Sequence, residues 1–150
     1  MKVLFAHDHV FYKYKDSMYS TGGLSNTILK RYTTVFDEVT VISRQKVLSS
    51  NIQNLTLAST KNVHFVKVPD FKKIRGMCKI FEAKRIIRNE VENCDALIAR
   101  LPSSIGALAV KYAKRLNKPY LVELVACPWD AYWNHSLIGK FVAPFVYLTT

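Results

Sequence analysis

Short apolar runs alternate along the chain with segments in which apolar residues recur every three or four positions. The runs predict five β-strands, at residues 2–6, 38–43, 63–68, 95–99 and 120–125. The helical spacing predicts three helices, at residues 24–32, 80–91 and 105–116. Ser103 is the predicted N-cap of the last helix, and Asn117 with Pro119 is predicted to end it.

Two segments lack either pattern and are predicted to be loops. Residues 7–23 begin with His7-Asp8-His9, continue through several aromatic residues and end in Thr21-Gly22-Gly23. Residues 44–61 are mostly polar and show no clear period.

The alternation of strands and helices predicts one α/β domain over residues 1–150. We expect a doubly wound, Rossmann-like parallel sheet with helices on both faces and right-handed crossovers. Sheets of this kind bind ligands at the carboxyl ends of their strands. Polar residues at those ends are therefore the candidates for a site.

The glycine pair Gly22-Gly23 stands just before the first predicted helix. Exposed N–H groups and the positive end of the helix dipole attract anions there, and glycine lets a phosphate approach the main chain. The pattern is neither G-x-G-x-x-G nor a Walker A sequence. A simple loop-to-helix turn is the alternative.

Three polar side chains accompany the predicted strand ends. His9 follows the first strand, Arg100 ends the fourth, and Glu123 lies inside the fifth. A guanidinium can hold a phosphate or a sugar hydroxyl, whereas a buried carboxylate needs a partner. Arg100 and Glu123 are therefore predicted to form an ion pair, to bind a ligand, or both. His9 is either a ligand-binding group or a structural histidine.

The net charge of +11 is high for 150 residues and is concentrated in residues 61–88. Such charge suits nucleic acid, an anionic membrane surface or phosphate-bearing substrates. A basic nucleic-acid-binding α/β module is the alternative function, but no helix-turn-helix, RNP or zinc-finger pattern occurs, so we expect no nucleic acid as partner. Metal-ligand spacing and a Ser-His-Asp order are also absent from the sequence. We predict no metal, and the catalytic residue stays unassigned.

Several motifs together resemble the N-terminal domain of GT-B glycosyltransferases, in particular glycosyltransferase family 4 of bacterial capsular and surface polysaccharide synthesis. The resemblance covers essentially the whole chain. It rests on the glycine pair and on three later stretches: Ile98-Ala99-Arg100-Leu101-Pro102-Ser103, Lys118-Pro119-Tyr120-Leu121-Val122-Glu123 and Pro128-Trp129-Asp130-Ala131-Tyr132-Trp133-Asn134. It departs from the family at Ala126-Cys127, where many members carry a histidine or an acid.

The resemblance implies a hexosyltransferase that retains anomeric configuration and uses a nucleotide-sugar as co-substrate, with no metal or other cofactor. Gly22 and Gly23 would bind the donor phosphates. The acceptor, a saccharide or a lipid-linked saccharide, would be bound by His9, Arg100, Glu123, Trp129 and Asp130. The partner C-terminal domain, which binds the donor in this family, is absent from the 150 residues, so the chain alone is expected to be inactive.

The location is predicted to be cytoplasmic, on the inner face of the cytoplasmic membrane. No signal peptide is recognisable, and the three widely spaced cysteines fit reduced thiols. The basic segment and an apolar tail from Leu137 predict peripheral attachment to an anionic membrane surface. The alternative is that the basic side chains are simply solvated and that the tail packs on the second domain.

Overall fold

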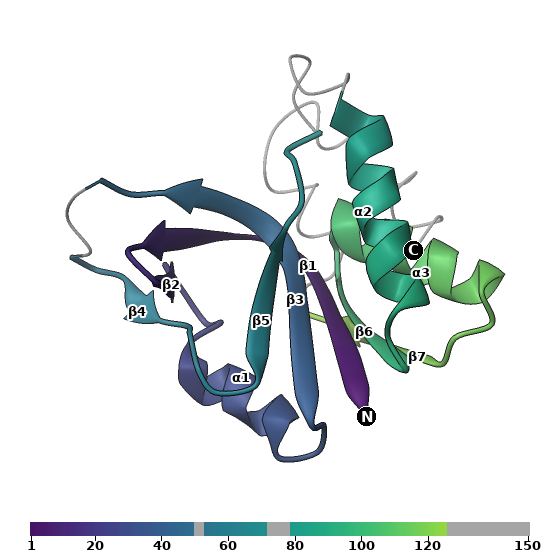
Figure 1. Ribbon diagram of the computed structural model, residues 1–150, viewed down its shortest axis with the longest axis horizontal. Helices are drawn as coiled ribbons and strands as arrows, with labels where there is room; N and C mark the ends of the chain where they lie inside the picture. Colours follow the sequence, from purple (N-terminus) through teal and green to yellow (C-terminus); the bar gives the residue numbers. More distant parts are fainter. Residues whose placement is uncertain (50–52, 72–78, 126–150) are drawn as a thin grey trace.

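The computed structural model describes residues 1–49, 53–71 and 79–125. Seven strands and three helices occur in these ranges (Figure 1). In chain order they are β1 (Lys2–Tyr14), β2 (Ser17–Ser20), α1 (Asn26–Thr33), β3 (Glu38–Val47), β4 (Thr56–Leu57), β5 (Val63–Lys67), α2 (Ile80–Glu92), β6 (Ala96–Leu101), α3 (Ser104–Arg115) and β7 (Tyr120–Leu124). All five predicted strands and all three predicted helices are present.

Five strands run parallel in the spatial order β5-β3-β1-β6-β7. Numbered along the chain these are strands 3-2-1-4-5, the order of a Rossmann-like sheet, so the predicted α/β class is confirmed. The prediction of a wholly parallel sheet is wrong. β2 pairs antiparallel with β1, and β4 pairs antiparallel with β2, so the sheet is mixed.

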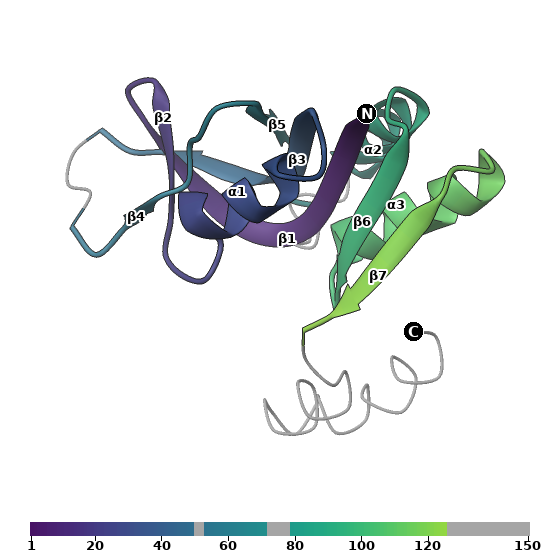
Figure 2. The same cartoon turned by 90° about the horizontal axis from the view of Figure 1, so that it is seen from below.

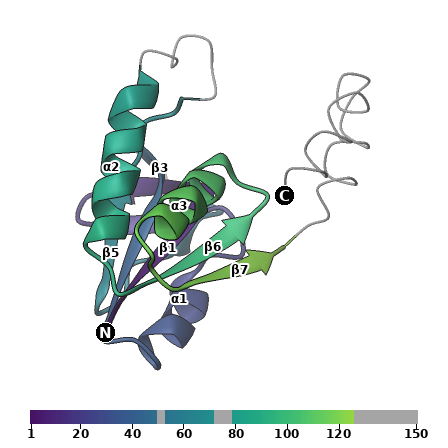
Figure 3. The same ribbon diagram turned by 90° about the vertical axis from the view of Figure 1, so that its right-hand side faces the viewer.

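Side chains of the central strands alternate between two cores, as the pleat requires. On β1, Leu4 and Ala6 belong to the core beneath α2 and α3, whereas Val3 and Phe5 belong to the core beneath α1. Figure 3 shows α2 and α3 on one face of the sheet and α1 on the other. All four of these side chains are fully buried, which makes β1 the centre of both cores.

The predicted loop at residues 7–23 is instead mostly β-structure. β1 continues to Tyr14 and turns through Lys15, which has a φ of 51°, into β2. Of the aromatic residues in this segment, Phe11 is buried, and Tyr12, Tyr14 and Tyr19 are partly buried. Burial alternates along β2, which is a strand pattern, but the polar residues 7–9 separate this segment from the apolar run at residues 2–6 in the sequence.

The predicted loop at residues 44–61 is also partly wrong. β3 runs on to Val47, and β4 occupies Thr56–Leu57. The end of β3 is polar because main-chain pairing rather than core burial holds it. Val10 to Lys13 on the extended β1 pair with Arg44 to Val47. Figure 2 shows how β1 curves away from β6 to meet this partner.

α3 begins as predicted, and a second residue supports its start. The Ser103 hydroxyl accepts a hydrogen bond from the Gly106 N–H at 2.9 Å. The Asp8 carboxylate accepts another from the Ser104 N–H at 2.8 Å. A carboxylate at a helix N-terminus is favoured by the helix dipole as well as by the hydrogen bond. Asp8 therefore joins β1 to the first turn of α3.

Gly106 should resist substitution because α3 lies very close to β6 there. An added Cβ would stand 3.0 Å from the Arg100 carbonyl oxygen and 3.0 Å from Leu101 Cδ2. The gain in helix propensity from Gly to Ala is offset by this overpacking, which costs about 1–3 kcal/mol. We expect Gly106→Ala to lower the free energy of unfolding by about 1 kcal/mol, as measured by urea denaturation. Gly23→Ala is the control, because a Cβ there meets nothing within 4 Å. Equal stability of the two variants would contradict this.

Candidate functional site

A β-bulge at residues 7–9 of β1 organises the candidate site. Ala6 pairs with Ile42 and Val10 pairs with Arg44, so three residues of β1 stand opposite Ser43 alone. Bulges redirect side chains and are common beside functional sites. Here the bulge sends polar groups of neighbouring residues to different partners.

His9 lies on the α1 side of the sheet and connects the bulge to the glycine segment. Its ring meets the buried Phe11 edge-on, with the centroids 4.8 Å apart. Its Nε2 is 2.8 Å from the hydroxyl of Ser20, a fully buried residue. The Gly22 N–H donates to the same hydroxyl at 3.2 Å. Ser20 thus fixes both the imidazole and the start of the glycine segment.

Both histidines of the bulge are neutral at pH 7. Burial, followed by the nearby charges of His7, Arg44 and Arg100, lowers the pKa of His9 to about 4. Burial also lowers the pKa of His7, although a contact between His7 Nδ1 and the Arg100 carbonyl oxygen at 3.2 Å partly opposes the shift. The two rings lie almost parallel, with centroids 6.4 Å apart.

Arg100 and Glu123 form the ion pair that the sequence allowed. They are register partners on β6 and β7, and Arg100 Nε and Nη2 both lie 2.9 Å from Glu123 Oε2. The Tyr32 hydroxyl, from α1, donates to the other carboxylate oxygen at 2.8 Å. Both oxygens of Glu123 are therefore engaged within the chain. Its side chain is still 24% exposed, and that of Arg100 is 20% exposed, so solvent reaches the pair.

Tyr32 holds this network in one protonation state. Burial and the hydrogen bond to Glu123 raise the pKa of Tyr32 to about 12, so its hydroxyl remains a donor at neutral pH. Arg100 Nη2 in turn donates to the Tyr32 oxygen at 3.4 Å. The guanidinium carbon also lies 5.4 Å from the centroid of the Phe5 ring, within cation–π range.

Gly22 and Gly23 are exposed, and no residue in the described ranges requires glycine at either position. Neither has a positive φ, and a Cβ added to either meets nothing within 4 Å. α1 follows directly, and its N-cap residue Ser25 makes no side-chain capping hydrogen bond. Apart from the Gly22 N–H, which donates to Ser20, the segment can thus present main-chain N–H groups to an anion without a steric obstacle.

The structure joins four of the predicted site residues into one group. Contacts run from Gly22 through Ser20, His9 and His7 to the Arg100–Glu123–Tyr32 network. We call Ser20, His7, His9, Tyr32, Arg100 and Glu123 the α1-side cluster. Trp129 and Asp130, also predicted to bind the acceptor, lie outside the described residues.

Two members of the α1-side cluster were missed by sequence reasoning. Ser20 falls inside the segment that is predicted to be a loop, and Tyr32 occupies an apolar position of the first predicted helix. The signal in the sequence for a polar role of Tyr32 is its hydroxyl group, because the residue otherwise fits an apolar helix position. Sequence spacing does not reveal the pairing of Ser20 with His9, which depends on the turn between β1 and β2. It does not reveal that of Tyr32 with Glu123 either, because these two residues are 91 positions apart.

Within residues 1–49, 53–71 and 79–125, no three His, Cys, Asp or Glu side chains are grouped so that they can hold a metal ion. Cys94 is a free and buried thiol, and burial raises its pKa.

The chain is similar to a longer bacterial protein. It is 38% identical over 157 residues to Protein CapJ of Staphylococcus aureus, an alignment that covers 99% of this chain and 38% of that protein. The chain therefore spans about two fifths of the length of this curated relative. No protein-family profile matches the chain.

Among solved structures, the C-terminal domain of the PF1911 hydrogenase from Pyrococcus furiosus is similar over 82% of this chain and 91% of that domain. The identity is 13% and the TM-score is 0.39. A likeness this weak carries no argument about fold or function.

His9 should make the stability depend on pH. Its pKa is about 4 in the folded chain and has the ordinary value of 6.5 when unfolded, so the unfolded state binds more protons between these values. The contribution of the neutral imidazole is complete above pH 6.5 and is lost as the pH falls toward 4. The unsubstituted chain should lose unfolding free energy when the pH falls from 7 to 5. In His9→Gln this loss should be smaller by about 1 kcal/mol, a value that allows for solvent screening.

Urea denaturation at the two pH values measures this change. His64→Gln is the matched control, because the His64 side chain is 63% exposed; it should keep the pH dependence of the unsubstituted chain. If His9→Gln also kept that dependence, burial of the His9 ring would not be its source.

Proposed function

We propose that this chain is the acceptor-side N-terminal domain of a glycosyltransferase similar to family 4, built as one half of a GT-B fold. The reaction would transfer a sugar from a nucleotide-sugar to a saccharide or lipid-linked acceptor during capsule synthesis. The name of the relative CapJ suggests a role in capsule biosynthesis, which supports the biological context. The Rossmann-like strand order supports the architecture.

The observation that carries the proposal is that nothing in the described part of the chain requires glycine at Gly22 or Gly23. Their backbone angles are accessible to other residues, and their surroundings have room for a side chain. Glycine at both positions is explained if something outside the chain approaches the main chain closely. A diphosphate at the N-terminal end of α1 is such a group, because N–H donors and the helix dipole both favour it.

The α1-side cluster supports binding of a sugar next to that diphosphate. Neutral imidazoles, a neutral tyrosine hydroxyl, a guanidinium and a carboxylate supply donors and acceptors within one connected group. The network holds these side chains in place before a ligand arrives, which lowers the entropic cost of binding. His9, Arg100 and Glu123 would contact acceptor hydroxyls, and Trp129 with Asp130 would complete the site.

In the proposed reaction the bond between the anomeric carbon and the donor phosphate oxygen breaks, and a bond to the acceptor oxygen forms. The nucleoside diphosphate leaves with the bonding electrons, and the proton of the acceptor hydroxyl passes to the departing phosphate oxygen. The role of this chain is to place the acceptor oxygen near the anomeric carbon, which can supply several kcal/mol of the barrier reduction. The donor would be held mainly by a second domain, so the 150 residues alone should not turn over.

The glycine pair provides a test in the full-length protein. Because the chain has room for a side chain at Gly23, Gly23→Val should change the unfolding free energy by less than about 0.5 kcal/mol. It should nevertheless raise the KM for the nucleotide-sugar at least about tenfold, equivalent to 1.4 kcal/mol, by obstructing the diphosphate. Release of nucleoside diphosphate from a panel of nucleotide-sugars is the assay.

Val35→Ala, an exposed position just beyond the other end of α1, is the control and should leave KM unchanged. A full-length protein that releases no nucleoside diphosphate from any donor would contradict the proposed function. An active protein whose KM is insensitive to Gly23→Val would contradict the role of the glycine pair only.

Peripheral attachment to an anionic membrane belongs to the same proposal. Phe81, Lys84, Arg85 and Arg88 are exposed and lie at positions i, i+3, i+4 and i+7 of α2, which places them on one stripe. The opposite face of α2 is buried in the core. An exposed aromatic ring among basic side chains is typical of interfacial helices. None of the described helices is long and apolar enough to cross a membrane.

Other parts of the basic segment, including Lys72, Lys73 and Arg75, lie outside the described residues, as does the apolar tail. The described stripe alone is enough for a test. Lys84→Glu with Arg85→Glu should abolish most co-sedimentation of the chain with anionic vesicles, because each basic residue near such a surface contributes about 1 kcal/mol. Lys111→Glu with Lys114→Glu, on the exposed side of α3, changes the net charge equally and should have a much smaller effect. Equal loss in both double variants would contradict a defined membrane-facing stripe.

A further inference from the structure

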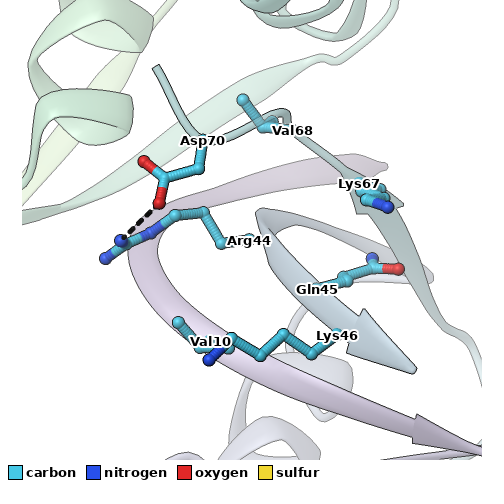
Figure 4. Close-up of a pocket in the computed structure, with 7 residues that line it drawn as sticks. All are labelled: Val10, Arg44, Gln45, Lys46, Lys67, Val68 and Asp70. Carbon is cyan, nitrogen blue, oxygen red and sulfur yellow. Dashed lines mark ion pairs between the residues drawn. The ribbon is translucent and has the colours of Figure 1, made fainter. Parts of the chain in front are cut away.

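A basic hollow lies beside the ends of β3 and β5, apart from the α1-side cluster. It has a volume of about 180 Å³ and is lined by Val10, Arg44, Gln45, Lys46, Lys67, Val68 and Asp70 (Figure 4). Val68 belongs to the core beneath α2 and α3.

Arg44 is held in place on one side of the hollow. Its Nε and Nη2 donate to the Asp8 carbonyl oxygen at 3.0 and 2.6 Å. Asp8 is itself fixed by its hydrogen bond to the first turn of α3. The guanidinium is thus anchored before any ligand binds, and its side chain is 26% exposed. An anchored guanidinium loses little entropy when it binds an oxyanion.

The charges around the hollow favour an anion. Arg44 Nη1 lies 3.7 Å from Asp70, an ion-pair separation that is longer than a good hydrogen bond. Lys46 is two residues further along β3, so its side chain projects to the same side as that of Arg44, as Figure 4 also shows. With Lys67, three basic side chains and one carboxylate line the hollow, and the local charge is therefore +2. Lys46 and Lys67 are both exposed and can move toward a ligand.

We propose that this hollow binds a phosphate group of the acceptor, as a phosphomonoester or diphosphate. The proposal rests on the proposed glycosyltransferase function, in which a lipid-linked acceptor carries such a group. A fixed guanidinium with two flexible ammonium groups matches a multiply charged oxyanion better than a single carboxylate, because donors can reach it from several directions. The site is separate from the glycine pair, where the donor diphosphate would bind.

Titration of the chain with inorganic pyrophosphate, followed by calorimetry at low salt, tests the site. Lys46→Gln with Lys67→Gln should weaken pyrophosphate binding at least fivefold. Lys30→Gln with Lys111→Gln removes the same charge from exposed positions on α1 and α3, and should change it less than twofold. Val10→Phe narrows the hollow without a change in charge and should also weaken binding, in a variant whose thermal unfolding shows that it is folded.

Equal weakening by the two lysine pairs, or no pyrophosphate binding at millimolar concentration, would overturn the site. A second arm uses vesicles of phosphatidylglycerol and of phosphatidylcholine to identify the source of the phosphate. Loss of binding to phosphatidylglycerol vesicles in the Lys46–Lys67 variant would assign it to a lipid headgroup; loss of pyrophosphate binding alone would assign it to a phosphate-bearing substrate. Pyrophosphate binding needs no sugar transfer, so a full-length protein without transferase activity would leave this result standing.

Discussion

β1 pairs with three neighbouring strands, and its N-terminal and C-terminal halves have different pairing partners. Val3 to Ala6 pair with β3 on one side and β6 on the other, deep between the two cores. Phe11 to Tyr14 pair with β3 and with the antiparallel β2. Both sets of main-chain hydrogen bonds must be satisfied by one continuous strand, and the register shift at residues 7–9 makes this possible. The positions of the candidate site residues depend on this shift.

The bulge distributes the polar groups of three consecutive residues to both sides of the sheet. His7 and His9 join the α1-side cluster through contacts with the Arg100 carbonyl and Ser20. Asp8, between them, supports the first turn of α3 with its carboxylate and fixes Arg44 with its carbonyl oxygen. An uninterrupted strand would alternate these side chains as well, but it would leave no main-chain carbonyl free for a side chain. The extra residues supply that acceptor.

The basic hollow lies beside the ends of β3 and β5, whereas the α1-side cluster lies at the switch point of the sheet. At this point the chain order of the parallel strands reverses between β1 and β6. Ligands of open α/β sheets bind at this place because the connections diverge to opposite faces there. In this chain α1 leaves toward one face, and α2 and α3 cover the other. The glycine segment and the α1-side cluster lie on the first face. Arg44 is instead hydrogen-bonded to Asp8, whose carboxylate contacts the first turn of α3. This separation would let a donor and an acceptor phosphate be held without repelling one another at short range.

The sequence by itself determined the elements whose pattern is local. The buried runs predicted the five parallel strands, and Ser103 with the spacing from Ile105 to Leu116 predicted α3, because burial and capping act within a few residues. It also identified Arg100 and Glu123 as candidates, since a charge in an apolar strand needs a partner. Only the tertiary structure decided that β1 continues beyond the polar residues 7–9, because the stabilising pairing comes from β2 and β3 rather than from its own pattern. The same holds for Tyr32 and Ser20: their hydrogen bonds join segments that are distant or reversed in the chain, and no periodicity records which hydroxyl a sheet will bring beside which charge.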